Sequence, residues 1–188
     1  DVRVAIVSRG YGARANATND EARELASRLP DVPHFQHPDR VKAAKTAIDK
    51  CAAQLIILDD GFQHRRLARD LDLVLIDATE PFGGRHVFPR GLLREPLSGL
   101  GRADIVVLTR SHLIAAARRK QIRQEVLQHA PQANWLEVSH HPIGLRSASG
   151  QSHPLQAWSG ARVAAFCAIG NPQAFRDTLA RQGWQLTR

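Results

Sequence analysis

The residues with the most evident chemistry are two adjacent carboxylates, Asp59 and Asp60, which directly follow the apolar run at residues 55–58. Two carboxylates at the carboxyl end of a buried strand can hold a hard cation through oxygen or water ligands. Gln63 and His64 add polar side chains at the same point. Such a cluster is costly to place without a ligand or a network that satisfies it. The sequence therefore predicts a cation site here, with a solvated turn cap as the alternative.

A second polar loop, residues 8–12, follows the apolar alternation of residues 2–7. Its glycines permit the positive φ of a tight turn or the close approach of a ligand. Because α/β proteins bind ligands at the carboxyl ends of their strands, we expect the two loops to share one mouth. Arg9 and Gly10 are predicted to contact the ligand there.

Both loops need a sheet to hold them, and the chain alternates strands with helices in a way that builds one. The predicted strands are residues 2–7, 32–35, 55–58, 73–76 and 105–108, and the predicted helices are residues 18–28, 38–51 and 111–129. Continuous apolar strands separated by helices are typical of a parallel α/β sheet. We expect residues 1–132 to form one such sheet flanked by helices.

The same pattern predicts how the chain divides into units. Residues 1–138 are predicted to form the larger core, which includes a glycine- and proline-rich loop at residues 77–102 of a length that is usually functional. The polar stretch 139–158 is predicted to be a hinge or hairpin linker. Residues 159–188 are predicted to begin a smaller second α/β domain.

The charge of the chain suggests an anionic partner. The net charge is +8, and 22 of the 26 basic residues are arginine, the side chain best shaped for bidentate contact with phosphate. An aromatic content of 5% offers no stacking platform for single-stranded nucleic acid, so no specific nucleic-acid partner is expected. Anionic lipid heads or an arginine-rich coding bias account for the same charge. No apolar run approaches the length of a membrane span, and the cysteines, Cys51 and Cys167, are predicted to be free thiols.

Several motifs follow one another along the chain: Ser8-Arg-Gly-Tyr-Gly12, Asp59-Asp-Gly-Phe-Gln-His64, Arg69-Asp-Leu-Asp-Leu-Val-Leu-Ile-Asp77, Pro81-Phe-Gly83, Leu93-Arg-Glu-Pro96, Arg102-Ala-Asp104 and Ala168-Ile-Gly-Asn-Pro172. Their order is the one found in the tetraacyldisaccharide 4'-kinase family, which the sequence resembles over nearly its whole length. The resemblance implies a P-loop-kinase-like parallel sheet followed by the start of a smaller α/β domain. It also implies Mg²⁺-dependent transfer of the ATP γ-phosphate to the 4'-hydroxyl of a tetraacylated glucosamine disaccharide 1-phosphate. The setting implied is the cytoplasmic face of the bacterial inner membrane, with peripheral attachment.

The resemblance also implies roles for individual residues. The implied catalytic residues are Asp20, Asp59, Asp60 and His64; the implied nucleotide-binding residues are Arg9, Gly10, Arg40 and Gln63; and the implied metal ligands are Asp59, Asp60, Glu21 and Glu95. Asp20 and Glu21 match the acidic pair of a Gly-Asp-Glu-Pro motif whose acid takes the hydroxyl proton, although Asn19 and Ala22 replace its glycine and proline. The alternative for Asp20 is a partner of the helix dipole.

Two motifs that such a kinase requires are absent from these 188 residues. No Gly-Lys dipeptide occurs, so the chain contains no G-x-x-x-x-G-K-[ST] phosphate cradle, and the family's Asp-His-His motif is missing as well. We expect both in neighbouring segments, and we expect these residues alone to show no measurable lipid kinase activity. The rival interpretations are a nucleotide-dependent switch or partition-type ATPase, and a basic nucleic-acid-binding module.

Overall fold

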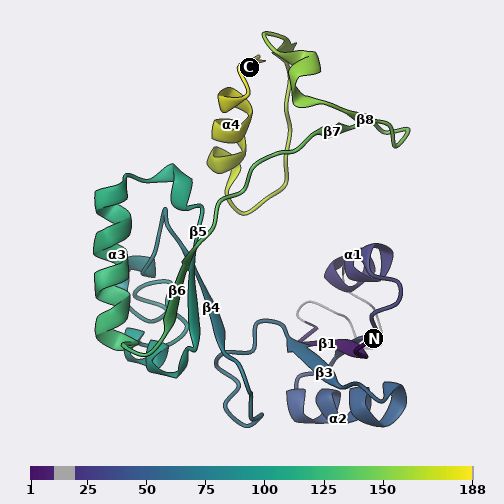
Figure 1. Ribbon diagram of the computed structural model, residues 1–188, viewed down its shortest axis with the longest axis vertical. Helices are drawn as coiled ribbons and strands as arrows, with labels where there is room; N and C mark the ends of the chain where they lie inside the picture. The colour runs from purple at the N-terminus through teal and green to yellow at the C-terminus, as the bar shows by residue number, and fades with distance from the viewer. Residues whose placement is uncertain (11–19, 188) are drawn as a thin grey trace.

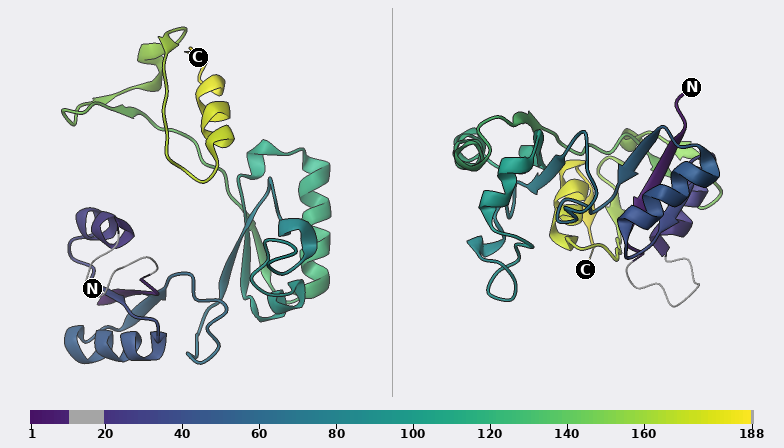
Figure 2. Two further views of the ribbon diagram at one scale, coloured as in Figure 1. Left: turned by 180° about the vertical axis from the view of Figure 1, so that it is seen from behind. Right: turned by 90° about the horizontal axis from the view of Figure 1, so that it is seen from below.

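The computed structural model describes residues 1–10 and 20–187, apart from the side chain of Glu21. Its larger strands are β1 (Val4–Ser8), β2 (His34–Gln36), β3 (Leu55–Leu58), β4 (Leu73–Asp77), β5 (Ile105–Thr109) and β6 (Asn134–Glu137). Its α-helices are α1 (Asp20–Arg28), α2 (Arg40–Cys51), α3 (Ala116–His129) and α4 (Pro172–Arg181). The predicted alternation of strands and helices is thus confirmed, and Figures 1 and 2 show the helices beside the strands.

The strands of the core form two parallel sheets, with the orders β2-β1-β3 and β4-β5-β6. The prediction of one continuous sheet is therefore wrong for the part of the chain that the structure describes. β3 and β4 are both edge strands, and they lie apart in Figure 1. Parallel neighbours are joined by crossover connections, usually helical. Residues 59–72 between β3 and β4 form turns only, so β4 is not brought into register with β3.

The main core lies between the second sheet and α3. Its most deeply buried side chains are Val106 and Leu108 of β5 and Ile122 and Val126 of α3. β4 belongs to this core through Ile76, which is 6% exposed, while the adjacent Leu75 is 64% exposed. Successive side chains of a strand point to opposite faces, so only one face of β4 is covered among the described residues.

This contrast predicts unequal costs for the same substitution at neighbouring positions. Ile76→Ala is expected to lower the free energy of unfolding by about 2–5 kcal/mol, because it leaves a cavity in the core. Leu75→Ala removes exposed atoms and is expected to cost less than about 1 kcal/mol. Urea denaturation of the two variants measures both values, and equal losses would show that the two faces of β4 are equally buried.

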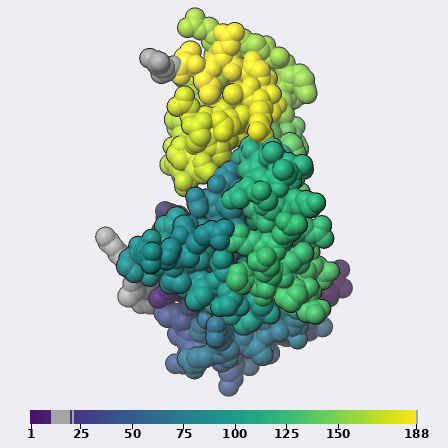
Figure 3. Space-filling view, turned by 90° about the vertical axis from the view of Figure 1, so that its left-hand side faces the viewer, coloured from purple at the N-terminus to yellow at the C-terminus, as the bar shows by residue number. Residues whose placement is uncertain are grey.

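The residues after β6 form a smaller unit at one end of the molecule, coloured green to yellow in Figure 3. It contains the antiparallel pair β7 (Leu145–Arg146) and β8 (Ser152–His153), a 3-10 turn at Leu155–Trp158, the parallel pair β9 (Arg162–Val163) and β10 (Gln185–Leu186), and α4. Of the hinge or hairpin predicted for residues 139–158, the structure shows a hairpin, the pair β7–β8. The domain boundaries themselves stay predictions.

No helix in the described ranges 1–10 and 20–187 has the length and apolar character needed to cross a membrane.

A histidine pair lies where the core meets the smaller unit. The rings of His112 and His141 are 5.2 Å apart between centroids. Partial burial lowers the pKa of His112, and the positive charge of Arg181, together with His141 and His140, lowers it further.

This pKa shift predicts a loss of stability in mild acid. The unfolded chain protonates His112 near the ordinary value of 6.5, whereas the folded chain resists protonation until a lower pH. The unfolded state therefore binds more protons in this window, and the free energy of unfolding falls as the pH falls through 6.5. Urea denaturation at assay pH values from 7.5 to 5.5 measures the free energy of unfolding. As the pH falls, this free energy should decline less steeply in His112→Asn than in the parent chain. Identical declines would mean that His112 does not contribute.

Candidate active site

Two loops of the core leave the same edge of the first sheet. β1 and β3 are parallel neighbours, with Val7 opposite Leu58, and the backbone N–H of Asp59 donates to the carbonyl oxygen of Val7 at 2.9 Å. The residues after β1 and those after β3 therefore emerge side by side at the carboxyl ends of the strands. The shared mouth predicted for these two loops is confirmed for Arg9 and for the acidic segment that begins at Asp59.

A cavity of about 420 Å³ opens at this mouth. Its lining residues are Arg9, Pro38, Arg40, Asp60, Gln63, His64 and Arg94. Three guanidinium groups thus face one carboxylate, and this excess of positive charge favours an anionic ligand. Guanidinium is the side-chain group that best matches the geometry of phosphate oxygens.

Arg40 is the most buried of the charged residues that line the cavity. It is 8% exposed and begins α2, directly after the N-cap residue Asp39. Its Nη1 donates to the carbonyl oxygen of Pro38 at 2.9 Å, but its Nε is buried with no hydrogen-bond partner among the described residues. A buried donor without a partner costs free energy. An anion that accepts a hydrogen bond from this group would remove that cost, which favours anion binding.

Asp39 caps the N-terminus of α2, which begins at Arg40. Its carboxylate accepts the backbone N–H groups of Val41 at 3.0 Å and Lys42 at 3.4 Å. Partial desolvation raises the pKa of Asp39, but these hydrogen bonds and the positive charges of Arg66 and Lys42 lower it by more. The carboxylate stays ionised and caps the helix at neutral pH.

Two glycines let the loops approach as closely as they do. Gly10 has φ +72°, in the left-handed region, and an added Cβ would lie 3.0 Å from the Cβ of Gln36. At Gly61 an added Cβ would lie 2.2 Å from the Cγ of Leu58, so a larger residue in the turn after the acidic pair would force the Leu58 side chain to move.

Asp60 forms an ion pair with Arg94 from the long loop. The hydrogen bond from Arg94 to Asp60 and the charge of this carboxylate raise the pKa of Arg94. The two side chains are 53% and 64% exposed, and exposed ion pairs contribute only about 0–1 kcal/mol. A cation or a phosphate could therefore replace either partner at little cost.

The structure gives Glu95 a different environment from the predicted metal site. Its carboxylate accepts from Nη2 of Arg102 at 2.7 and 3.0 Å, and the same Nη2 donates to the carbonyl oxygen of Phe62 at 3.3 Å. The Arg102 guanidinium also lies 4.4 Å from the centre of the Phe62 ring. Glu95 is absent from the cavity lining. Through Arg102 and an ion pair with Arg65 at 3.5 Å, Glu95 ties the long loop to the segment after β3, next to the ion pair of Arg94 with Asp60.

Asp20 also lies outside the cavity. It is the first residue of α1, its side chain is fully exposed, and it forms an ion pair with Arg23 at 3.5 Å. The expectation that Asp20 faces the shared mouth is therefore wrong for this structure. This placement matches the alternative of a carboxylate at a helix N-terminus. The side chain of Glu21 and residues 11–19 lie outside the described residues.

Among the described side chains, no three His, Cys, Asp or Glu residues gather closely enough to hold an ion by themselves, and the side chain of Glu21, one of the implied metal ligands, lies outside them. Mg²⁺, however, is usually bound by one or two carboxylates, several waters and the phosphates of its substrate. Asp60 in the cavity and the adjacent Asp59 fit that requirement. Their role as magnesium ligands stays a prediction.

Arg94 was not predicted to be a site residue, although it lies in the Leu93-Arg-Glu-Pro96 motif. Arg94 and Glu95 are adjacent charged residues, and only their separate partners in the structure distinguish them. Other motif residues stabilise the fold. Arg69 donates two hydrogen bonds to the carboxylate of Asp72, at 2.6 and 3.0 Å, and the carboxylate of Asp104 accepts the backbone N–H of Asp72 at 2.7 Å.

Comparison with known proteins shows to which family the chain belongs. The family model for tetraacyldisaccharide-1-P 4'-kinase matches residues 1–188. The chain belongs to this kinase family. Tetraacyldisaccharide 4'-kinases from Halothermothrix orenii and Anaeromyxobacter dehalogenans (strain 2CP-C) are 36% and 41% identical to it. Each alignment covers 96% of this chain but only 54% and 52% of the relative, so the chain spans about half the length of the curated relatives it matches.

A solved structure from the same kinase family confirms the α/β fold class. The crystal structure of LpxK from Aquifex aeolicus in complex with ATP is 27% identical and has a TM-score of 0.72. The alignment covers 98% of this chain and 60% of that chain.

Proposed function

We propose that this chain supplies the acidic strand end and the arginine-lined cavity of an ATP-dependent tetraacyldisaccharide 4'-kinase. The observation that carries the proposal is the cavity that joins Arg9, Arg40 and Arg94 to Asp60, Gln63 and His64. Phosphoryl transfer requires little covalent chemistry from the protein, so positioning and charge neutralisation perform most of the catalysis. This cavity offers both.

Each lining residue has a role in the proposed reaction. The arginines hold the phosphates of ATP and offset their negative charge. Asp60 and Asp59 hold Mg²⁺ through oxygen or water ligands, and the ion, when bound, neutralises charge that develops on the transferred phosphoryl group. Gln63 and His64 shape the mouth; the buried Nε2 of His64 has no partner among the described residues, so it is available to a ligand.

The proposed acceptor is the 4'-hydroxyl of a tetraacylated disaccharide 1-phosphate, and the proposed setting is the cytoplasmic face of the bacterial inner membrane. The names of the relatives support the acceptor. The net charge of +8 supports attraction to anionic lipid heads.

Transfer of radiolabelled γ-phosphate to the tetraacylated disaccharide, measured in the complete gene product with and without Mg²⁺, tests the proposed function. We expect transfer that requires both Mg²⁺ and the disaccharide. ATP hydrolysis that proceeds equally well without the disaccharide would contradict the proposal, because a kinase of this type needs its acceptor.

A further inference from the structure

A group of polar side chains lies behind Arg9, where β1 ends, and has no part in the reaction described above. Ser8, the last residue of β1, is 2% exposed. Its Oγ lies 2.9 Å from Nε2 of His34 and accepts a hydrogen bond from Nε2 of Gln36 at 3.3 Å. Both partners belong to β2, the parallel neighbour of β1. A buried hydroxyl costs free energy unless it is hydrogen-bonded, and here the adjacent strand supplies its partners.

Contacts with β2 fix the chain on both sides of Arg9. The backbone N–H of His37 donates to the carbonyl oxygen of Ser8 at 3.1 Å. On the other side, Gly10 lies so close to Gln36 that an added Cβ would be 3.0 Å from the Cβ of that residue. Arg9 itself is exposed and lines the arginine-rich cavity. The end of β2 therefore determines where the Arg9 side chain enters the cavity.

The same segment leads to Arg40, the buried arginine of the cavity. Pro38 lines the cavity as well, and its carbonyl oxygen accepts from Nη1 of Arg40 at 2.9 Å. Residues 34–40 thus hold the backbone at Arg9 and carry Arg40 at their end. The spacing between the two guanidinium groups depends on this one segment.

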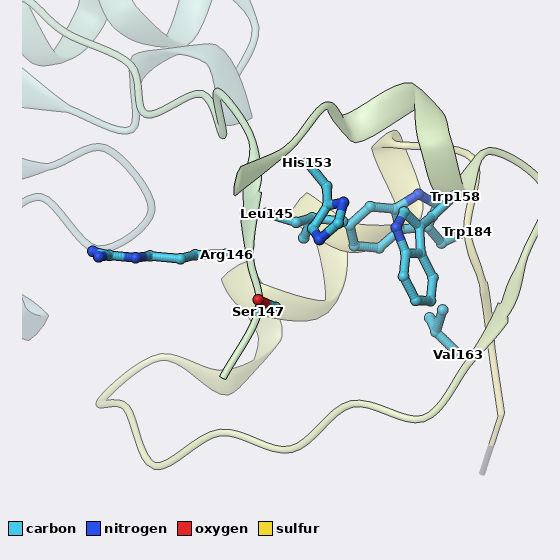
Figure 4. A pocket seen from close by; sticks show the side chains of 7 residues that line it. All are labelled: Leu145, Arg146, Ser147, His153, Trp158, Val163 and Trp184. Carbon is cyan, nitrogen blue, oxygen red and sulfur yellow. The ribbon is translucent and has the colours of Figure 1, made fainter. Parts of the chain in front are cut away.

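Another cavity, of about 330 Å³ in the smaller unit, offers a comparison. Figure 4 shows Ser147 next to Arg146 in its lining, with the guanidinium of Arg146 extending away from the two indole rings. The hydroxyl of Ser147 bonds within its own turn, to Oγ of Ser149 at 2.8 Å and to the backbone N–H of Gln151 at 3.0 Å. Ser8 differs because its partners come from a neighbouring strand, so its hydrogen bonds join two elements at the base of the site.

We propose that Ser8, His34 and Gln36 are positioning residues for ATP binding. Through the backbone of residues 8–10 they hold Arg9 where it binds the phosphates of ATP together with Arg40. The inference rests on the proposed function, because that function supplies the nucleotide. An arginine on an unfixed loop has to be ordered when an anion binds, which weakens the affinity by about two- to tenfold. A loop that is held in advance avoids this loss.

Calorimetric titration of the complete gene product with ATP tests the positioning role. Ser8→Ala removes the shared hydroxyl, and Gln36→Leu removes the amide at similar size. We expect each to raise the Kd of ATP by about two- to tenfold. His34→Gln keeps a polar group that can bond to the hydroxyl, so it should lose less affinity than His34→Leu. The matched control is Thr46→Ala, which removes a hydroxyl that donates to the carbonyl oxygen of Lys42 at 2.9 Å on α2 and should leave the Kd unchanged.

A double-mutant cycle separates positioning of Arg9 from a general loss of stability. In an Arg9→Gln background, Ser8→Ala should have no further effect on the Kd of ATP, because the side chain through which it acts is already gone. Additive effects of the two substitutions would overturn the proposal, as would an equal loss of affinity in Thr46→Ala. An unchanged Kd in both Ser8→Ala and Gln36→Leu would refute the positioning role alone. A parent protein that binds no ATP would refute the proposed function and this inference with it.

Discussion

Replacing Asp60 with alanine in the complete gene product is expected to lower kcat by about 10²–10³-fold, the usual cost of removing one electrostatic stabiliser of a transition state. Asp60 is the one carboxylate among the residues that line the arginine-rich cavity. Without it, the metal loses an oxygen ligand and the charge on the transferred phosphoryl group is less well compensated. Initial rates of γ-phosphate transfer, measured across a range of Mg²⁺ concentrations, give kcat and the metal requirement together.

The matched control is Asp49→Ala, which removes an exposed carboxylate on α2. It should leave kcat within about twofold, in line with the small effects of surface substitutions. The fold should survive Asp60→Ala, because the ion pair with Arg94 is exposed and contributes little to stability. Unchanged Mg²⁺-dependent turnover in Asp59→Ala/Asp60→Ala would show instead that the acidic pair only caps a turn.

Replacing Arg40 with glutamine is expected to abolish anion binding in the arginine-lined cavity and to lower kcat/KM for ATP by about 10²-fold. The guanidinium is buried, and its Nε lacks a partner among the described residues, so a phosphate oxygen would satisfy it. Arg40→Lys retains the charge but loses the planar fork, and it should recover only part of the affinity.

Inorganic pyrophosphate serves as the probe of Arg40 in the 188-residue chain itself. A ligand present at 100 times its Kd stabilises the folded state by about 2.7 kcal/mol, which corresponds to a rise in Tm of roughly 5–10 °C for a chain of this size. We expect this rise in the parent chain and in Arg118→Gln, an exposed arginine on α3, and no rise in Arg40→Gln. An equal rise in all three would place the anion elsewhere.

The order of the strands and the polar residues at their ends predicted part of the site. The segment from Asp59 to His64 and the loop at Arg9 were correctly expected at one mouth, because strands β1 and β3 end in polar residues and parallel strands end on the same side. The pairing of the strands could not be predicted from the sequence. The apolar runs of β3 and β4 look equally buried in sequence, yet Leu55 is 48% and Leu73 47% exposed because each lies at the edge of a separate sheet.

By itself, the sequence determined the α/β class, the order of strands and helices, and the polar segments at the strand ends, since these depend on local periodicity and on which residues tolerate a turn. The tertiary structure alone decided which charged side chains meet. Arg94 faces Asp60, while the adjacent Glu95 faces Arg102, and Asp20 is exposed to water. Neighbours along a loop point in different directions, and their partners lie 7 to 34 residues away in sequence. Such partners are set by how the long loop packs on the segment after β3, which no local pattern encodes.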